Sequence, residues 1–437
     1  MKYDVIIAGA GMAGLIAART AARDGLKTLV LESKKNISEI NRACSAVVRM
    51  SREGFMTAKK PTDKTVQPVE ITLEMDADKA QFHFFQLGFS VDYTGPIRVY
   101  HNKVNLSPSG YEIWNYPDNN RFWAFQLDKE IFTADLFKAA TEAGAEIRTE
   151  TSVLTAENVP GGVMVPVQTR TGQETLEARA LVAADGVMSR IVDTMGLNAK
   201  RRPLGESRVL MYILEGVETG YPESTFVTIA IPSLNSYMLF ALGLWPGDTF
   251  QLHTSTTPGI NLPAALDGFM KHPRYAGWFK KARVVKRLGC ARMLRMSLAE
   301  PVAGNIFFAG DAVSFVECSI KGALAAGFKA ARCAAKQMEG KDGRAEFTDW
   351  WQHSFNFNSP QYIAAGRSVP RPTQVLTDEE VNDLYRICKG KWGVLNDVIG
   401  DNLELVKKEK PAIYEKLTAP PDTGGRPDGA GFRPTTQ

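Results

Sequence analysis

The stretch that decides the fold is KYDVIIAGAGMAGLIAARTAARDGLKTLVLES, residues 2–33. Its apolar run at residues 5–8 is typical of a buried parallel strand, and a second such run ends at Leu31. Between these runs, the glycine pattern G-x-G-x-x-G at residues 9–14 opens an alanine-rich helix. The order of strand, glycine turn, helix and strand predicts a βαβ unit that binds the pyrophosphate of a dinucleotide.

Each glycine of this turn has its own physical reason. Gly9 permits the tight turn, Gly11 lets the backbone approach a pyrophosphate, and Gly14 lets the helix pack close to the strand. Ala13 lies at the helix N-terminus, whose unpaired N–H groups and positive dipole end suit phosphates. Glu32 ends the second strand and is placed to accept hydrogen bonds from a ribose. The unit alone does not separate NAD from FAD.

Two later segments also place glycine and an acid directly after a strand. ARALVAADG puts a short apolar strand before Asp185-Gly186, and GNIFFAGD puts another before Gly310-Asp311. A small-residue helix begins near Gly322, and its N-terminus suits developing negative charge. Taken singly, the first acid also suits an ordinary turn and the second a helix cap, so both roles stay open.

Together the three motifs resemble the FAD-binding fold of the glutathione-reductase type, which aromatic hydroxylases, electron-transfer-flavoprotein dehydrogenases and the geranylgeranyl reductase family share. The resemblance implies FAD, with the first motif at the pyrophosphate and Asp311 at the ribityl chain. It also implies that the backbone near Val153 meets the adenine. The implied cofactor-binding residues are Gly9, Gly11, Ala13, Gly14, Glu32, Ser33, Lys34, Arg42, Ala43, Val153, Asp185, Gly186, Gly310, Asp311, Gly322 and Ala323.

One segment resembles the geranylgeranyl reductase family in particular. ESKKNISEINRACSAV, residues 32–47, is similar to that family's pattern of an acid, a basic pair, a short loop and P-x-x-C-G. The family cysteine corresponds to Cys44, whereas Asn41 replaces the usual proline, and Ser45 and Ala46 replace glycines. A further departure lies in FQLDKEIF, where DK stands at the position of the family's arginine.

Two residues of this segment carry alternative interpretations. The resemblance places Cys44 near the flavin ring as a catalytic residue, where its thiol could tune the flavin or donate a proton. The alternative is a small buried filler. Arg42 would meet phosphate or substrate charge, or else face solvent.

The whole chain predicts an α/β fold: a Rossmann-like FAD-binding domain, an inserted antiparallel β-sheet substrate domain and a C-terminal helical region. The expected boundaries are 1–60, 125–196 and 285–345 for the FAD-binding domain, 61–124 and 197–284 for the substrate domain, 346–417 for the helical region, and 418–437 for a flexible tail rich in proline and glycine.

Composition excludes several classes of protein. A net charge of +4 over 437 residues is too small to indicate nucleic-acid binding. The five cysteines are widely spaced, and the five histidines form no metal-like pair, so we expect neither a disulfide framework nor a metal. No apolar run approaches bilayer length, and no signal-peptide pattern follows the first strand. We expect a cytoplasmic protein, with peripheral membrane contact left open.

The family resemblance implies an FAD-dependent oxidoreductase that reduces or forms a carbon–carbon double bond of an apolar or prenyl-like substrate, by hydride transfer at flavin N5. The aromatic-rich insertions suit such a small apolar substrate. The alternatives are an FAD-dependent aromatic monooxygenase, an electron-transfer flavoprotein or quinone-linked dehydrogenase subunit, and a flavin-fold protein that has lost its cofactor. The chain has no second G-x-G-x-x-G, so we expect an external electron donor: NAD(P)H, ferredoxin or another redox protein.

Overall fold

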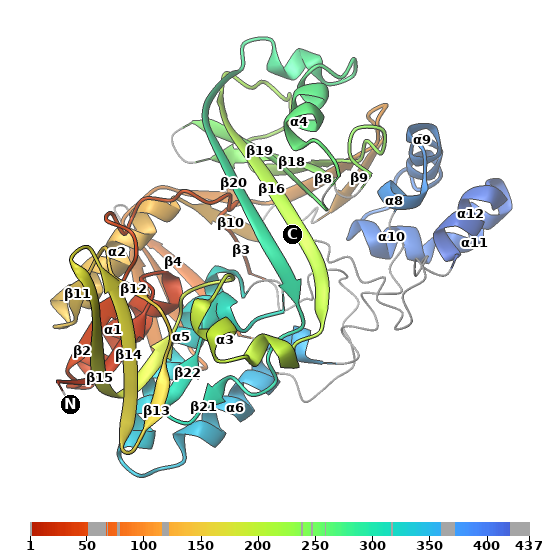
Figure 1. Cartoon of the computed structure of the whole chain (residues 1–437). Coiled ribbons are helices and arrows are strands. Elements are labelled where there is room, and N and C mark those ends of the chain that lie inside the picture. The colour runs from red at the N-terminus through yellow and green to blue at the C-terminus, as the bar shows by residue number, and fades with distance from the viewer. Residues whose placement is uncertain are drawn as a thin grey trace.

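The computed structural model describes residues 2–50, 67, 69–76, 79–115, 122–236, 239–245, 248–257, 259–315, 318–359 and 372–419. The described chain forms a cofactor lobe around the N-terminal sheet, a second lobe around a larger sheet, and a group of C-terminal helices beside the second lobe (Figure 1). Most of the expected tail, from residue 420 onward, lies outside the described residues.

The cofactor lobe is built on a parallel sheet in the order β11-β2-β1-β15-β22. Its strands are β1 (Tyr3–Ala8), β2 (Thr28–Leu31), β11 (Glu146–Arg148), β15 (Gly172–Ala183) and β22 (Ile306–Phe308). The first half of β15 also forms antiparallel pairs that extend the sheet. Strand β14 (Gly162–Thr169) pairs with β15, β12 (Ser152–Val153) and β13 (Glu157–Val159) pair with β14, and β21 (Val302–Ala303) pairs with β22.

Helices α1 (Met12–Arg23) and α5 (Ser319–Met338) pack closely against each other beside this sheet. At the crossing, a Cβ added to Gly327 would lie 2.0 Å from the carbonyl oxygen of Ala13. Only glycine allows this approach, because the backbones of the two helices are in contact there. The crossing therefore fixes the N-termini of both helices relative to the carboxyl ends of the strands.

The second lobe is a seven-stranded sheet in the order β20-β16-β19-β18-β17-β8-β9. All neighbouring strands are antiparallel except β17 and β8. Helix α4 (Leu262–Met270) and the 3₁₀ helix η2 (Ala276–Phe279) pack with it around a separate apolar core. The strands are β8 (Asn102–Leu106), β9 (Glu112–Asn115), β16 (Pro203–Glu215), β17 (Thr225–Ile229), β18 (Phe240–Trp245), β19 (Thr249–Thr256) and β20 (Arg283–Arg295).

Two small sheets modify the expectation of a single inserted sheet. One contains β3 (Val47–Arg49), β10 (Ala124–Leu127) and β7 (Ile97–Tyr100), and the other contains β4 (Thr72–Asp76), β5 (Lys79–Phe84) and β6 (Phe89–Tyr93). In the second of these sheets, Phe82 stacks edge-on against Phe132 of helix α2 (Lys129–Glu142). This sheet therefore belongs to the core of the cofactor lobe, because its buried aromatic face packs there.

The C-terminal helices divide between the two lobes. Trp351 of α6 donates a hydrogen bond of 2.9 Å to the Leu298 carbonyl, which attaches α6 to the cofactor lobe. Helices α9 to α12 share an apolar core with Ile113 of β9, at the far end of the seven-stranded sheet (Figure 1). The remaining helices are α3 (Arg190–Thr194), α6 (Gly343–Ser354), α8 (Pro372–Val375), α9 (Asp378–Ile387), α10 (Leu395–Asp401), α11 (Leu403–Glu409), α12 (Pro411–Thr418) and the 3₁₀ helices η1 (Leu197–Lys200), η3 (Gly310–Ala312) and η4 (Asn356–Asn358).

Among the described residues, no helix is both long and apolar enough to cross a bilayer. The same residues contain no group of histidine, cysteine and acidic side chains that could hold a metal ion.

Candidate functional site

A cleft of about 540 Å³ opens at the carboxyl ends of β1, β2, β15 and β22. This is the edge of a parallel α/β sheet where nucleotides bind, because helix N-termini and strand ends converge there. The cleft is lined by the turns after these four strands, by the loop at residues 37–47, by β12 and by the first turns of α1 and α5. The cleft brings together the glycine turn and the turns at Asp185 and Asp311, although the first and the last of these motifs are about 300 residues apart in sequence.

The glycine turn forms a cradle that suits a pyrophosphate. Helix α1 begins at Gly11 without a side-chain cap, so its first N–H groups have no intrahelical partner. A Cβ added to Gly11 would meet no atom within 4 Å, which leaves open space beside these groups. A Cβ added to Gly14 would lie 1.8 Å from the Gly9 carbonyl oxygen, and Gly9 itself has φ of +96°. The turn therefore has room and donors for the FAD pyrophosphate.

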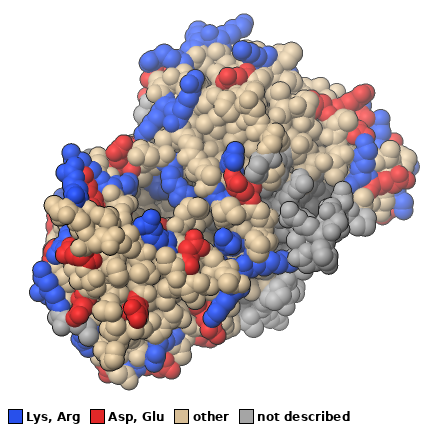
Figure 2. Space-filling model, in the orientation of Figure 1, with Lys and Arg blue, Asp and Glu red and all other residues tan. Residues whose placement is uncertain are grey.

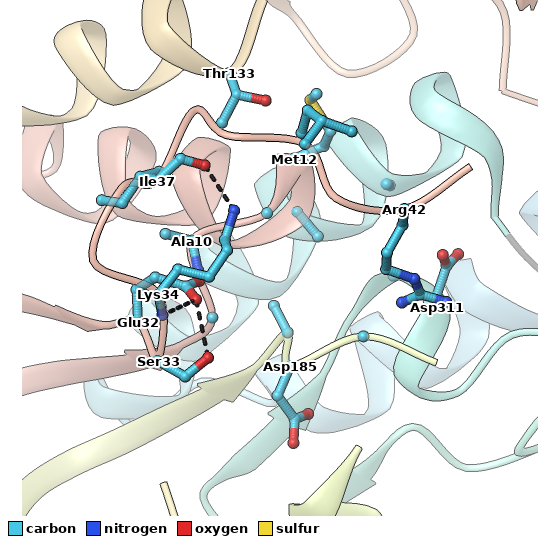
Figure 3. Close-up of a pocket in the computed structure, with 18 of the residues that line it drawn as sticks. Ala10, Met12, Glu32, Ser33, Lys34, Ile37, Arg42, Thr133, Asp185 and Asp311 are labelled. Carbon is cyan, nitrogen blue, oxygen red and sulfur yellow. Dashed lines mark hydrogen bonds between the residues drawn. The ribbon is translucent and has the colours of Figure 1, made fainter. Parts of the chain in front are cut away.

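Glu32 is fixed at the end of β2 by the backbone around it. The Ala10 N–H and the Lys34 N–H each donate to its carboxylate at 2.8 Å, and the Ser33 hydroxyl donates at 3.1 Å (Figure 3). The Lys34 ammonium turns to the Ile37 carbonyl at 2.7 Å and closes the following loop. Glu32 is thus buried, oriented and adjacent to the glycine turn, as a ribose-binding acid requires.

Asp185 mainly organises its own turn. Its carboxylate accepts a hydrogen bond of 2.6 Å from the Ser189 hydroxyl and one of 3.3 Å from the Ile191 N–H. Burial raises the pKa of Asp185 above its ordinary value, although these donors oppose the shift. The next residue, Gly186, also lines the cleft with φ of +83° and open space at its Cβ position. The chain therefore approaches the cleft here through its backbone.

Asp311 connects the turn after β22 to the start of α5. Its carboxylate accepts a hydrogen bond of 2.8 Å from the Cys318 N–H, directly before the helix. In Figure 3 the side chain of Arg42 points toward Asp311 from the opposite side of the cleft. Ala323 lies farther along α5 and also lines the cleft. This arrangement places an acid and a helix N-terminus together on one wall.

Arg201, which the sequence did not single out, holds the backbone that follows Asp311. Its guanidinium donates to the carbonyls of Ala312 at 3.1 Å and Ser314 at 2.7 Å, and also to that of Met296 at 2.8 Å. Burial lowers the pKa of Arg201 to about 10, and nearby Arg295 adds to the shift. Nothing in the local sequence identifies this role, because its partners come from distant segments.

Three residues expected at the cofactor do not line the cleft. Gly14 lies behind the cradle, where it allows close packing. Gly322 faces the ring of Phe355, since a Cβ added there would lie 2.9 Å from that ring. Ala43 packs against the seven-stranded sheet. The other residues expected to bind the cofactor all line the cleft, as does Cys44.

The loop that carries Cys44 is held by two distant segments, β10 and β20. Gln126 is fully buried and donates a hydrogen bond of 2.7 Å from its amide to the Ser45 carbonyl. The Leu127 N–H donates to the Ala46 carbonyl at 3.3 Å, and the Ala43 N–H donates to the Gly289 carbonyl at 3.4 Å. Cys44 itself is half-buried and lines the cleft. The loop is therefore ordered by tertiary contacts on both sides of the cysteine.

Ala46 explains how the loop tolerates the loss of the family's glycines. Its φ is +51°, in the left-handed region that glycine adopts most easily. An alanine there carries roughly 1–2 kcal/mol of conformational strain, which the surrounding hydrogen bonds offset. The backbone keeps a glycine-like conformation although the residue is alanine.

Apolar side chains lie near this loop on the side of the second lobe. Met211, Ile213 and Leu288 are buried on the seven-stranded sheet and pack with Ala43. This apolar sheet face therefore lies directly behind the segment that carries Cys44.

Two lysines, Lys321 of α5 and Lys103 of β8, both lie near Arg49 of β3. The Lys321 ammonium donates to the Arg49 carbonyl at 3.3 Å. Burial, together with the nearby Arg49 charge, lowers the pKa of Lys103 to about 7 and that of Lys321 to about 8. On the surface, lysine and arginine side chains rim the hollow between the two lobes (Figure 2).

The cradle, the oriented Glu32 and the Asp311 wall define a dinucleotide-binding flavoprotein. Two family models, each described as an FAD binding domain, match residues 4–80 and 125–235. FAD is therefore the cofactor, as the sequence motifs predict. Glu32 would hold its ribose, the glycine turn its pyrophosphate and Asp311 its ribityl chain.

Comparison with known proteins narrows this class. The chain is 32% identical over 202 residues to the digeranylgeranylglycerophospholipid reductase of Methanocella arvoryzae, covering 45% of the chain but only 42% of that relative. It is 22% identical to digeranylgeranylglycerophospholipid reductase 1 of Methanococcoides burtonii, over 94% of both chains. A geranylgeranyl bacteriochlorophyll reductase-like protein from Thermoplasma acidophilum has the same fold, with a TM-score of 0.67, 17% identity, and coverage of 95% of this chain and 98% of its own. These likenesses support the expected resemblance to the geranylgeranyl reductase family, and the shared fold confirms the expected fold class. The chain spans less than half the length of the relative from Methanocella arvoryzae.

Proposed function

We propose that this protein uses FAD to reduce a carbon–carbon double bond in a prenyl chain of a lipid substrate. The observation that carries the proposal is the Cys44 loop, which presents a thiol to the cofactor cleft and lies against an apolar sheet face. The names of the relatives from Methanocella arvoryzae and Methanococcoides burtonii support a prenyl lipid. The cations at Arg49, Lys103 and Lys321 suit an anionic group on such a substrate.

Once reduced by the external donor, FAD held by the glycine turn, Glu32 and Asp311 would supply hydride chemistry at N5 to the double bond. The chain then has three tasks. Cys44 holds a proton at Sγ for delivery to the other carbon and regains one from solvent. The N-terminus of α5, which Asp311 holds in place through the Cys318 N–H, stabilises negative charge at the cofactor wall. The apolar face at Met211 and Leu288 excludes water from the prenyl chain. The same geometry serves the reverse reaction, which forms the double bond.

The electrons come from outside the chain in this proposal. The sequence has no second dinucleotide motif, so NAD(P)H, ferredoxin or another redox protein would reduce the cofactor by transient contact. A prenyl lipid resides in a membrane, so the proposal also predicts peripheral contact with a bilayer surface.

The proposal is tested by anaerobic reoxidation of the photoreduced holoenzyme with a panel of prenyl, enoyl and quinone acceptors. We expect Cys44→Ser to keep FAD bound but to slow reoxidation by the prenyl acceptor about 100-fold, the usual contribution of a general acid. Cys290→Ser is the matched control, because this second half-buried thiol approaches the Ala43 carbonyl at 3.8 Å outside the cleft lining.

Two results would contradict the proposal in distinguishable ways. Wild-type rates in Cys44→Ser would leave Cys44 as a packing residue and keep the reductase function. Reoxidation by oxygen alone would reject the alkene-reductase function, and oxygen uptake stimulated by an aromatic acid would favour the monooxygenase instead.

A further inference from the structure

A second cavity lies at the opposite end of α1 from the cofactor cleft. Its volume is about 560 Å³, and it is bounded by the last turns of α1, the C-terminal half of α5 and the turn between β5 and β6. Helix α1 has 12 residues, so this end lies about 18 Å from the glycine turn. The cavity and the cofactor cleft have no lining residue in common, so the cavity is a separate site.

Basic side chains from two helices converge on this cavity. Arg19 and Arg23 are four residues apart on α1 and share one helical face. Lys329, Arg332 and Lys336 recur at helical spacing on α5. The close packing of α1 on α5 brings both faces to the same space.

The carboxylates that line the cavity are already engaged by the α5 cations. Asp24 accepts two hydrogen bonds from Arg332, at 2.7 and 2.9 Å. Glu346 accepts from Lys329 at 2.6 Å and from Lys336 at 2.5 Å. No carboxylate among the described lining residues is therefore left for the two α1 arginines.

Arg19 is the most constrained of these cations. Its Nη1 donates to the Ser90 carbonyl at 2.7 Å, which holds the guanidinium against the β5–β6 turn. Its Nε is buried and has no hydrogen-bond partner. The other charges near it are Arg23 and Asp92, and Asp92 accepts a hydrogen bond of 2.6 Å from Gln81. The guanidinium of Arg19 is therefore only partly satisfied by the protein, and an anionic ligand in the cavity would compensate its charge.

We propose that this cavity binds a phosphate group, with Arg19 and Arg23 as its principal ligands. Guanidinium groups match phosphate oxygens in a planar, two-pronged geometry, and a pair of them four residues apart on a helix can contact one phosphate. The phosphate belongs either to a lipid headgroup or to a small soluble molecule. Phe85, in the turn that borders the cavity, is 75% exposed and would enter a bilayer interface in the first case.

The experiment uses the FAD-loaded full-length protein and two phosphate sources. Sedimentation with phosphatidylglycerol vesicles, compared with phosphatidylcholine vesicles, tests the lipid headgroup. The melting midpoint in inorganic phosphate, compared with chloride at matched ionic strength, tests the soluble source. In whichever of the two assays detects binding by the wild type, we expect Arg19→Gln/Arg23→Gln to weaken that binding by about tenfold or more.

Further variants separate binding from folding and from net charge. Arg23→Gln alone changes an exposed side chain and should lose part of the binding even if Arg19 is needed for the fold. The control Arg170→Gln/Arg208→Gln removes the same charge elsewhere on the surface and should bind as the wild type does. FAD absorbance verifies that α1 is folded in each variant.

Binding of vesicles alone would assign the site to a lipid headgroup, and stabilisation by phosphate alone would assign it to a soluble ligand; both support the site. Equal behaviour of wild type and the Arg19/Arg23 variants in both arms would overturn it. An equal loss in the control variant would also overturn it, because the effect would then be general charge.

Discussion

The glycine turn at residues 9–14 and the Cys44 loop at residues 43–46 both contribute residues to the same cleft but are held in opposite ways. The turn is fixed by neighbours in sequence, such as the Leu15 N–H, which donates to the Gly11 carbonyl at 2.9 Å. The loop is fixed by Gln126, 81 residues away from its partner Ser45, and by the strand that contains Gly289. Cofactor binding is therefore encoded locally, whereas the position of the Cys44 thiol depends on assembly of both lobes.

The largest effect is expected from Gly14→Ala, which tests whether the local element determines FAD binding. The added Cβ would lie 1.8 Å from the Gly9 carbonyl oxygen, so the turn must move. We expect a loss of about 3 kcal/mol or more in unfolding free energy and little retained FAD, measured by denaturation and by flavin absorbance.

The matched control is Gly400→Ala in α10, where an added Cβ meets no atom within 4 Å. This change should preserve stability or raise it by up to about 1 kcal/mol. Full FAD content in Gly14→Ala would contradict the local origin of the cradle.

A second variant, Gln126→Leu, tests whether the Cys44 loop depends on distant support. The change removes the hydrogen bond that the buried Gln126 amide donates to the Ser45 carbonyl, which should destabilise the protein by about 1–3 kcal/mol. FAD should stay bound, because Gln126 does not line the cleft. Reoxidation by a prenyl acceptor should slow about tenfold or more as the thiol is displaced.

The control for that variant is Gln168→Leu. The side chain of Gln168 is exposed, and its amide donates a hydrogen bond to the carbonyl of the adjacent Thr169. It should leave both stability and reoxidation near wild type. If Gln126→Leu lowered stability without changing the substrate-dependent rate, Gln126 would be a structural residue and not a positioning residue for Cys44.

The smallest effect is expected from Ala46→Gly, which restores the residue type usual in the family. Because Ala46 has φ of +51°, glycine should relieve strain and raise the unfolding free energy by up to about 1 kcal/mol. Ala139→Gly in α2 is the contrasting control and should lower stability by about 1 kcal/mol. Chemical denaturation of the two variants should therefore give changes of opposite sign, and changes of the same sign would refute the strain at Ala46.

The sequence was informative wherever a binding element lies within one short segment. The β1–α1–β2 unit, Glu32 and the turns at Asp185 and Asp311 could all be predicted, because strand ends and glycine turns have local signatures. Arg201 and Gln126 could not, since each acts on backbone carbonyls that are distant in sequence. The local pattern identified where a nucleotide binds but not what holds the opposite wall.

Gly322 and the β4–β6 strands are further examples of features whose tertiary contacts the sequence did not predict. Gly322 belongs to the predicted small-residue helix, but its open face meets Phe355, which lies beyond the end of that helix. The alternating pattern of β5 correctly indicates a strand with one buried face. The alternating pattern does not indicate which lobe covers the buried face, because any apolar surface of suitable shape could do so.

By itself, the sequence determined that this protein binds a dinucleotide cofactor, because the cradle uses glycines, backbone N–H groups and one acid within about thirty residues. The later turns at Asp185 and Asp311 made FAD the expected dinucleotide. Only the tertiary structure decided where Cys44 lies, which sheets form the second lobe, and that Arg19 and Arg23 share a cavity with α5. The physical reason is that local signatures report backbone conformation, whereas these features depend on contacts between segments far apart in sequence, whose pairing is settled when the two lobes pack.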